Sequence, residues 1–458
     1  MLEAPEPGLA QSLTKMSAAG VGPTAQMIFA HYWQQLAAGA TGLTAEADIE
    51  PVADPPRLVA APVSAADREA FARTALLRLN GGLGTSMGLN RAKALLPVRD
   101  GLTFLDLIVR QTLAARDQYQ VRLPLLFLHS FSTQADSLQA LAAYPQLGLP
   151  GLPLDLVQSQ EPKLRRDDLT PVDWPANPAL EWCPPGHGDI YPSLFDSGLL
   201  DQLIEAGFDY LSVSNSDNLG CGPSPQLAGW FARSGAPYAA EITRRTAMDL
   251  KGGQIVRRRR DGRLMLRELA QTPAADQASF TDAERHPYTN TNNLWLNLPA
   301  LRAVLRQRQG ELGLPLIRNL KTVDPTDPAS PPVIQIESAM GAAIEVFDGA
   351  QVIAVSRDRF LPVKTTSELT LLRSDLYDWS DGWIPRPLVR PAPLIELGPS
   401  YQLINDYDRR LPFGLKLRQA KQLTVRGDWQ FGDGVRVVGR VTLDEAGGQL
   451  PDGCLLTE

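Results

Sequence analysis

The chain has 458 residues, enough for two or three domains of ordinary size, and 44% of them are hydrophobic. Its formal net charge of -7 argues against a nucleic-acid-binding surface and against a polybasic membrane patch, because both need clustered positive charge. The three cysteines lack pairing or metal-ligand spacing, the amino terminus does not resemble a secretory signal, and no apolar run could span a bilayer. We therefore expect a cytoplasmic protein with neither nucleic-acid nor membrane partners.

Residues 1–70 are predicted to form a helical N-terminal segment. Residues 26–38 place Phe29, Trp33 and neighbouring apolar residues at helical spacing, and such a stripe needs a partner surface. A proline-rich stretch at residues 49–62 is predicted to be a connector between the helical part and the rest of the chain.

From residue 71 onward, strand-like and helix-like stretches alternate. Short apolar strands are predicted at residues 76–79, 123–129, 154–158 and 210–215, and amphipathic helices at residues 103–119 and 191–206. This alternation predicts βαβ units and a parallel sheet, with ligands beyond the carboxyl ends of the strands. Residues 71–385 are predicted to form this α/β domain.

Residues 386–458 have a different pattern. Apolar residues recur every six positions in two series, and glycines separate them; the series are Leu423, Trp429, Val435, Val441 and Val425, Phe431, Val437, Leu443. A six-residue apolar period with turn glycines is typical of a parallel β-helix, here one of three or four turns. A pair of ordinary hairpins is the alternative.

The motif NGGLGTSMG at residues 80–88 has four glycines and follows a predicted strand. It is not a Walker motif, since no GK[ST] follows, and it does not match the dinucleotide fingerprint. Lys93 lies just beyond it. A loop whose amides cradle a triphosphate, with one ammonium folded over it, is a sound electrostatic arrangement.

Three further motifs carry polar groups that could reach a ligand. PPGHGD presents His187 and the Gly188 amide on a constrained backbone, which favours a ligand contact over a surface loop. SVSNSDNLG places Asn215 and Asp217 at a strand end, where an acid can bind Mg2+ or simply form a turn. FLPVKTTSEL places Lys364 after an apolar run, so that it could reach a phosphate.

KGG at residues 251–253, Glu268 and NTNNLW at residues 290–295 offer donors and acceptors suited to sugar hydroxyls, although plain loops would explain each of them alone. In this order and spacing, however, the motifs resemble those of the UTP–glucose-1-phosphate uridylyltransferases, the UDP-glucose pyrophosphorylases of the eukaryotic type. The resemblance also includes TFLDL, ESAMGAAIEVF and LTVRGDWQFGDGV, and it covers most of the chain.

The resemblance implies a glycosyltransferase-A-like nucleotidyltransferase domain, a C-terminal left-handed parallel β-helix and a Mg2+-dependent, reversible synthesis of UDP-glucose and pyrophosphate from UTP and glucose 1-phosphate. The sequence leaves the oligomeric state open, including a homo-oligomer through the C-terminal domain. In that family pattern the nucleotide would contact Gly81, Gly82, Gly84 and Asn215, and its triphosphate would contact Lys93. Gln158 and Gly188 would contact the uracil edge, and His187 the α-phosphate and sugar. The glucose would contact Gly253, Glu268, Asn292, Asn293 and Glu337. Lys364 would bind the sugar phosphate, and Asp217 the Mg2+.

Two motifs depart from the family pattern. Arg91 and Ala92 replace a Gly-Pro before the loop lysine, so the loop is expected to be less rigid. Residues 157–160 lack the usual arginine, and we expect Lys163 or Arg165 to supply that charge.

The sequence leaves three other functions open. The sugar could be galactose 1-phosphate or N-acetylglucosamine 1-phosphate, or the chain could be a non-catalytic regulatory subunit that binds a sugar nucleotide. Lys93, Asp217 and Lys364 together argue against the regulatory subunit. An acyltransferase built on the β-helix would need a catalytic histidine there, and all four histidines lie outside it.

Overall fold

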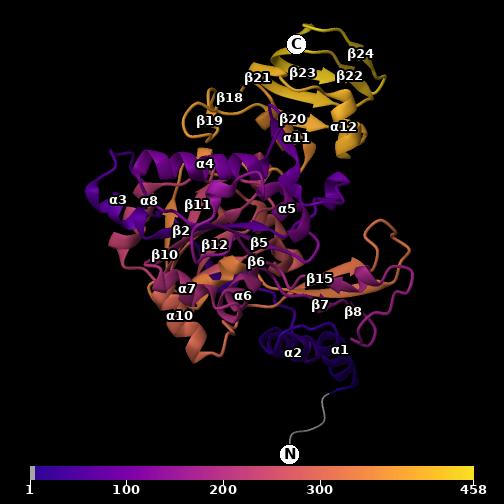
Figure 1. Cartoon of the computed structure of the whole chain (residues 1–458). Helices are drawn as coiled ribbons and strands as arrows, with labels where there is room; N and C mark the ends of the chain where they lie inside the picture. Colours follow the sequence, from indigo (N-terminus) through magenta and orange to yellow (C-terminus); the bar gives the residue numbers. More distant parts are fainter. Residues whose placement is uncertain (1–5) are drawn as a thin grey trace, which may run out of the picture.

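The computed structural model describes residues 6–458, and a seven-stranded sheet lies at its centre (Figure 1). From edge to edge the strands are β17 (Gln351–Ala354), β11 (Tyr238–Arg244), β14 (Tyr288–Asn297), β10 (Tyr210–Asn215), β2 (Thr74–Asn80), β5 (Leu125–His129) and β6 (Asp155–Val157). β14 runs antiparallel to both of its neighbours, and the other neighbouring pairs are parallel. The predicted α/β fold with a mixed, mostly parallel sheet is confirmed.

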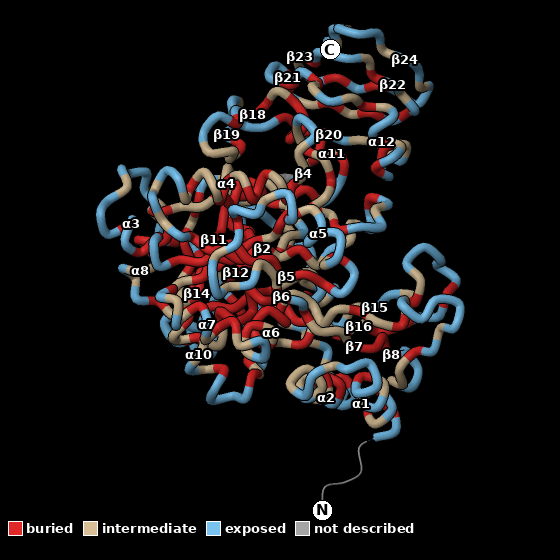
Figure 2. Tube along the Cα trace, viewed as in Figure 1, coloured by how far each residue is buried: buried red, intermediate tan, exposed pale blue. Residues whose placement is uncertain are grey.

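Helices cover both faces of this sheet, because successive residues of a strand point to opposite sides. Leu76 of β2 belongs to the same apolar cluster as Phe104, whereas Leu77 belongs to the same cluster as Leu194. The first face is covered by α3 (Ala65–Ala72), α4 (Phe104–Tyr119), α5 (Gln134–Leu141) and α8 (Pro225–Ser234), and the second by α6 (Ile190–Asp196), α7 (Leu199–Glu205) and α10 (Leu298–Gln307). The central strands are therefore buried on both sides (Figure 2).

Local sequence signals determine where these helices begin and end. Before α4, the Thr103 hydroxyl accepts a hydrogen bond from the Asp106 N–H (3.2 Å), and the Asp106 carboxylate accepts one from the Thr103 N–H (2.8 Å). The single helix expected over residues 191–206 is instead divided into α6 and α7. Gly198 separates them because it adopts the left-handed conformation, with φ of 71°.

The N-terminal helices α1 (Pro7–Ala18) and α2 (Pro23–Ala37) pack against a small second sheet of β15 (Ile317–Thr322), β16 (Pro332–Glu337) and β8 (Leu164–Arg165). Phe29 and Trp33 share an apolar cluster with Leu164 and Ile336, which form the partner surface that the sequence requires. After Ala37 the chain is mostly irregular, with a 3-10 turn at Glu46–Asp48 and β1 (Ile49–Pro51), which pairs with β12 (Gln254–Arg258) beside β13 (Leu264–Arg267). Residues 1–5 of the expected helical segment lie outside the described residues.

Parallel ladders form the C-terminal end of the molecule, opposite α1 and α2 (Figure 1). β20 (Leu394–Leu397), β21 (Lys416–Val425), β23 (Arg436–Leu443) and β25 (Leu455–Leu456) form one ladder, and β22 (Trp429–Phe431) and β24 (Gly448–Leu450) form another. Leu423 lies beside Val441, three six-residue repeats further along the chain. One repeat is therefore one side of a coil rather than a whole turn. α11 (Thr366–Arg373) and α12 (Ile404–Arg410) lie between these ladders and the main sheet.

Short elements complete the fold: α9 (Gln277–Thr281) and the strand pairs β3 (Pro97–Arg99) with β4 (Leu102–Thr103), β7 (Glu161–Pro162) with β9 (Trp182–Cys183), and β18 (Tyr377–Asp378) with β19 (Arg386–Pro387). Within residues 6–458, no helix combines the length and apolar character needed to cross a membrane.

Candidate active site

The glycine loop follows β2, as predicted, and it turns back onto Lys93. Gly84 has φ of 68°, and a Cβ there would lie 2.8 Å from Leu89 Cδ1 and 3.3 Å from Lys93 Cγ, so only glycine fits. The Lys93 N–H donates to the Gly82 carbonyl (3.0 Å). This bond ties the two ends of the loop together although Arg91 and Ala92 replace the usual Gly-Pro.

Lys93 and Asp217 are brought together from the segments that follow β2 and β10. The Lys93 ammonium lies 2.6 Å from Asp217 Oδ2, and each side chain is only 17% exposed. Lys93 also donates to the Val363 carbonyl, immediately before Lys364. Lys93, Asp217 and the backbone next to Lys364 therefore meet, because the carboxyl ends of β2 and β10 lie side by side in parallel.

The second oxygen of Asp217 is available for a further ligand. Asp217 Oδ1 is buried and has no hydrogen-bond partner within residues 6–458. A buried carboxylate oxygen without a partner is costly, so its position needs an explanation. The described residues contain no group of three or more His, Cys, Asp or Glu side chains suited to a metal. Any cation at Asp217 must therefore take further ligands from elsewhere, such as phosphate oxygens.

A cavity of about 140 Å³ opens beside these residues. Its lining includes Asn215, Asp217, Lys251, Gly252, Gly253, Glu268, Asn290, Asn292, Pro362 and Lys364. A Cβ on Gly253 would lie 2.5 Å from Glu268 Oε1, so the glycine lets this carboxylate approach the backbone. Burial raises the pKa of Glu268, and the nearby charge of Lys364 offsets this only in part.

Gln158 and His187 come from the loops that follow β6 and precede α6. Gln158 Nε2 lies close to Gly81, where an added Cβ would be 2.8 Å away. His187 Nδ1 accepts a hydrogen bond from the Met340 N–H (2.9 Å), which leaves the ring proton on Nε2. Burial lowers the His187 pKa to about 4, so the imidazole is a neutral donor at neutral pH.

The structure corrects two predicted contacts. The Gly188 N–H already donates to the Ser338 carbonyl (2.9 Å), so this amide is not free for a uracil. The Asn293 side chain is buried, and its Nδ2 donates to Glu241 (3.2 Å) and to the Arg359 carbonyl (3.3 Å), so this amide is engaged away from the cavity lining. Glu337 ends β16 and lies beside Gly186, and its predicted contact with the glucose stays a prediction.

The expected replacement for the missing arginine is also wrong. The Lys163 ammonium is buried and donates to the Val323 carbonyl (2.8 Å), whereas Arg165 pairs with Asp167 (2.6 Å). Both side chains are thus engaged away from the cavity.

Comparison with known proteins agrees with this geometry. The family model of the UTP–glucose-1-phosphate uridylyltransferases matches residues 35–438. The chain belongs to this family. The Solanum tuberosum uridylyltransferase is 38% identical over 389 residues, which cover 83% of this chain and 79% of that protein. The Saccharomyces cerevisiae enzyme is 38% identical over 392 residues, which cover 84% and 77%.

Solved structures of the uridylyltransferase family share the whole fold. A variant of the Leishmania major UDP-glucose pyrophosphorylase in complex with UDP-glucose matches with a TM-score of 0.91 and 37% identity over 99% of each chain. The UDP-glucose phosphorylase from Trypanosoma brucei matches with a TM-score of 0.90 and 37% identity, over 99% of this chain and 98% of its own.

Sequence reasoning missed several residues around the uridylyltransferase site. Asn290 lines the cavity and Asn293 does not, and because the lining residues of β14 are consecutive, strand alternation would not have assigned Asn290. Glu241 lies fully buried in β11. A glutamate inside the apolar stretch YAAEI indicates that a second buried residue must pair with its charge. Its partner, Arg359, carried no comparable signal, because arginines are frequent throughout this chain.

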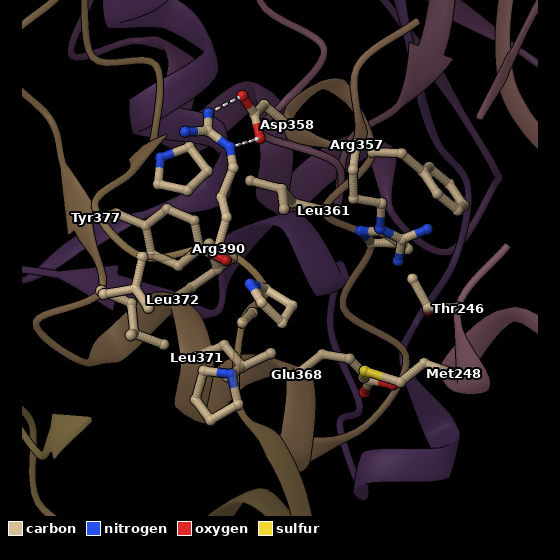
Figure 3. Close-up of a pocket in the computed structure, with 18 of the residues that line it drawn as sticks. Thr246, Met248, Arg357, Asp358, Leu361, Glu368, Leu371, Leu372, Tyr377 and Arg390 are labelled. Atoms are coloured by element: carbon tan, nitrogen blue, oxygen red, sulfur yellow. Dashed lines mark hydrogen bonds and ion pairs between the residues drawn. The ribbon is translucent and has the colours of Figure 1, made fainter. Parts of the chain in front are cut away.

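A second and larger pocket, of about 500 Å³, lies behind the Lys364 segment. Phe360 and Pro362 line both cavities. Arg357, Asp358 and Leu361 line this pocket from one side, and Leu371, Leu372 and Tyr377 line it from the side of α11 (Figure 3). The segment that carries Lys364 therefore separates the two cavities.

Proposed function

We propose that this member of the family converts UTP and glucose 1-phosphate to UDP-glucose and pyrophosphate, reversibly. The observation that carries the proposal is the meeting of Lys93, Asp217 and the Lys364 segment beside one polar cavity. Two highly negative substrates must be held together against their repulsion, and such a site supplies positioning and positive charge.

In the proposed reaction, a phosphate oxygen of glucose 1-phosphate attacks the α-phosphorus of UTP and forms a new P–O bond. The bond from the α-phosphorus to the oxygen that bridges to the β-phosphate breaks, and pyrophosphate leaves with that electron pair. The nucleophile is already an anion, so no general base is needed. This agrees with the low pKa of His187, which suits a neutral hydrogen-bond donor better than a base.

The proposed roles of the residues differ, and the glycine loop, Lys93 and Gln158 lie outside the lining of the cavity itself. The glycine loop and Lys93 hold the triphosphate, with Gly81 and Gln158 together at the base end. Lys364 binds the sugar phosphate and the α-phosphate. Removing one such charged contact typically raises the barrier by about 3 kcal/mol. Because the Gly188 amide is engaged, we assign recognition of the uracil edge to Gln158 rather than to this N–H.

The sugar lies, in this proposal, against Gly253, Glu268, Asn290 and Asn292. Their carboxylate and amide groups can accept from and donate to hydroxyls. Asn292 has φ of 57°, the left-handed conformation, at an irregularity in the pairing of β11 with β14. This irregularity turns its amide toward the cavity lining, where Asn290 Nδ2 donates to Asn292 Oδ1 (3.0 Å).

The residues present fit a Mg2+ ion at Asp217. Mg2+ takes one or two carboxylates together with phosphate oxygens, and Asp217 Oδ1 is the buried carboxylate oxygen without a partner. When bound, the ion supplies positive charge to the phosphates of UTP. Asp217 holds it in place, and Lys93 neutralises the other oxygen of the same carboxylate.

We also propose a division into an N-terminal helical segment (residues 1–70), a glycosyltransferase-A-like catalytic domain (71–385) and a C-terminal left-handed β-helix (386–458). The parallel ladders, with three repeats per coil, support the β-helix. A cytoplasmic location and an oligomer formed through the C-terminal ladders belong to the same proposal.

Pyrophosphate release tests the proposed function directly. The assay pairs each of UTP, ATP and GTP with each of glucose 1-phosphate, galactose 1-phosphate and N-acetylglucosamine 1-phosphate, with and without Mg2+. We expect UTP, glucose 1-phosphate and Mg2+ together to give the highest kcat/KM. Higher activity with another sugar phosphate would reassign the substrate, and no release from any pair would indicate a binding subunit.

A further inference from the structure

Lys364 is carried by a segment that has little regular structure of its own. Residues 357–363 begin as a 3-10 turn at Arg357–Arg359, and Pro362 then makes an isolated antiparallel bridge with Asn218. Lys364 itself is exposed. The position of its ammonium therefore depends on what holds the preceding residues.

Asn218 holds the backbone of this segment next to the metal candidate Asp217. Its Oδ1 accepts from the Leu361 N–H (2.8 Å), and its Nδ2 donates to the Arg359 carbonyl (3.0 Å) and to Asn293 Oδ1 (3.1 Å). Asn218 is 4% exposed. One buried amide thus fixes two backbone groups of the segment relative to the end of β10.

The Arg359 side chain anchors the same segment in the core. Its Nε and Nη2 donate to the two oxygens of Glu241 (2.8 and 3.0 Å), and its Nη1 donates to the Gly222 carbonyl (3.2 Å). Burial would raise the pKa of Glu241, but Arg359, Trp295 and Asn293 outweigh this effect and hold it below its usual value. Glu241 is therefore an ionised, fully buried carboxylate with its donors in place.

Two further ion pairs hold the start of the segment, and the first joins Arg357 to the buried carboxylate of Asp249 (2.6 and 3.1 Å). Asp358 pairs with Arg390, where the chain runs toward the C-terminal ladders (Figure 3). That arginine side chain is 63% exposed, so the ion pair contributes little fixed geometry. Of these attachments, the Arg359–Glu241 pair is the one whose carboxylate is completely buried.

We propose that Glu241, Arg359 and Asn218 form a positioning network for Lys364, which sets its ammonium relative to Asp217 and Lys93. The inference rests on the proposed catalytic role of Lys364. The same segment also accepts a hydrogen bond from Lys93 at the Val363 carbonyl, so a shift of this backbone would displace both lysines. None of the three network residues touches the substrate in this proposal.

A double-mutant cycle separates positioning from general stability. Arg359→Lys keeps the positive charge but loses the two-nitrogen contact with Glu241. We expect it to lower kcat about tenfold in the otherwise unchanged chain and less than about twofold in Lys364→Ala. The KM for UTP should change less than about threefold, because the nucleotide contacts come from other segments.

Asp67→Asn is the matched control, because Asp67 is also a buried carboxylate paired with an arginine, Arg233 (2.7 Å), away from the cavity. It should lower the melting temperature and leave kcat within about twofold. Asn218→Ser, made in the otherwise unchanged chain and in Lys364→Ala, gives a second cycle of kcat values in which no charge is altered.

The positioning role would be overturned if Arg359→Lys lowered kcat equally in the otherwise unchanged chain and in Lys364→Ala. It would also be overturned if Arg359→Lys caused no loss of kcat. A failure of both Arg359→Lys and Asn218→Ser to fold would overturn it as well, since the network would then be a requirement of the fold alone. The proposed function is tested by a different measurement in the same cycle: a normal kcat for Lys364→Ala by itself would remove that lysine from the reaction.

Discussion

Lys93 and Lys364 have the same chemistry but different surroundings. Lys93 is paired with Asp217 and mostly buried, whereas Lys364 is exposed at the edge of the cavity. The ammonium of Lys364 is thus free to bind a phosphate that arrives, and Lys93 contributes both to the structure of the site and to its charge.

At this scale we predict that Lys364→Ala lowers kcat about a hundredfold and changes the KM for UTP less than about threefold. The charge is needed most in the transition state, where the α-phosphate and the sugar phosphate are closest. Steady-state kinetics of pyrophosphate release measures both values. Lys421→Ala, at an exposed lysine of β21, is the control and should behave as the unchanged chain. A kcat within about threefold of normal for Lys364→Ala would contradict the prediction.

The second residue-scale prediction concerns the protonation of His187. Its pKa of about 4 lies below the value near 6.5 expected in the unfolded chain, so the unfolded state takes up this proton first. His187 therefore costs no stability at pH 7 and progressively destabilises the fold as the pH falls from about 6.5 to about 4. The chain has four histidines, so NMR of ring-labelled protein, assigned with His187→Asn, can follow it. A titration midpoint at about 6 or above would be inconsistent with the buried neutral ring.

At the scale of elements, β14 shows how one strand serves two purposes. Asn290 and Asn292 line the cavity, whereas the side chains of Asn293 and Trp295 donate to the Glu241 carboxylate. Thr291 does both, because it lines the cavity and donates to the Glu241 backbone carbonyl. Asn290 and Asn293 therefore have separate surroundings.

This separation predicts different outcomes for two neighbouring asparagines. Asn290→Ala should raise the KM for glucose 1-phosphate about tenfold and leave the melting temperature nearly unchanged, because its amide faces the cavity. Asn293→Ala should lower the free energy of unfolding by about 1–3 kcal/mol, because buried Glu241 loses a donor. Kinetics and thermal unfolding of both variants check this. The assignment fails if Asn293→Ala changes the KM more than Asn290→Ala does.

Predictions from the sequence were correct for elements that have strong local signals. They failed for side chains whose position is set by contacts with distant parts of the chain. The strands around Leu76 and Leu125, the capped helix after Thr103 and the glycine loop before Lys93 follow from local patterns, and the structure contains them. The Gly188 N–H donates to the carbonyl of Ser338, which lies far along the chain, and no local sequence pattern predicts this hydrogen bond. The Glu241–Arg359 pair is equally long-range. The placement of Asn293 also depends on distant contacts, because its amide bonds to Glu241 of β11 beside a pairing irregularity that no local pattern predicts.

At the scale of the whole molecule, the apolar core is continuous from the catalytic sheet into the C-terminal ladders. Leu105 of α4 and Ile395, Leu417, Leu423 and Val437 of the ladders belong to one cluster of buried residues. The C-terminal end is therefore attached through packing and not only through the chain.

This continuity predicts cooperative unfolding. Leu423 is fully buried, so Leu423→Ala should lower the free energy of unfolding by about 2–5 kcal/mol and shift a single transition of the whole molecule. Leu455 on β25 is 56% exposed, and Leu455→Ala should have little effect. Differential scanning calorimetry distinguishes the outcomes. A separate early transition confined to the C-terminal ladders would show that they fold independently.

The convergence of two lysines and one aspartate on the phosphates is the central claim. A crystal structure of the chain with UDP-glucose and Mg2+ tests it most directly. The account predicts the Lys364 ammonium within about 4 Å of a phosphate oxygen, that of Lys93 at the nucleotide phosphates or poised beside them on Asp217, and electron density for a metal at Asp217 Oδ1, about 2 Å away. UDP-glucose bound elsewhere, or a Lys364 ammonium pointing into solvent away from every phosphate oxygen, would contradict it.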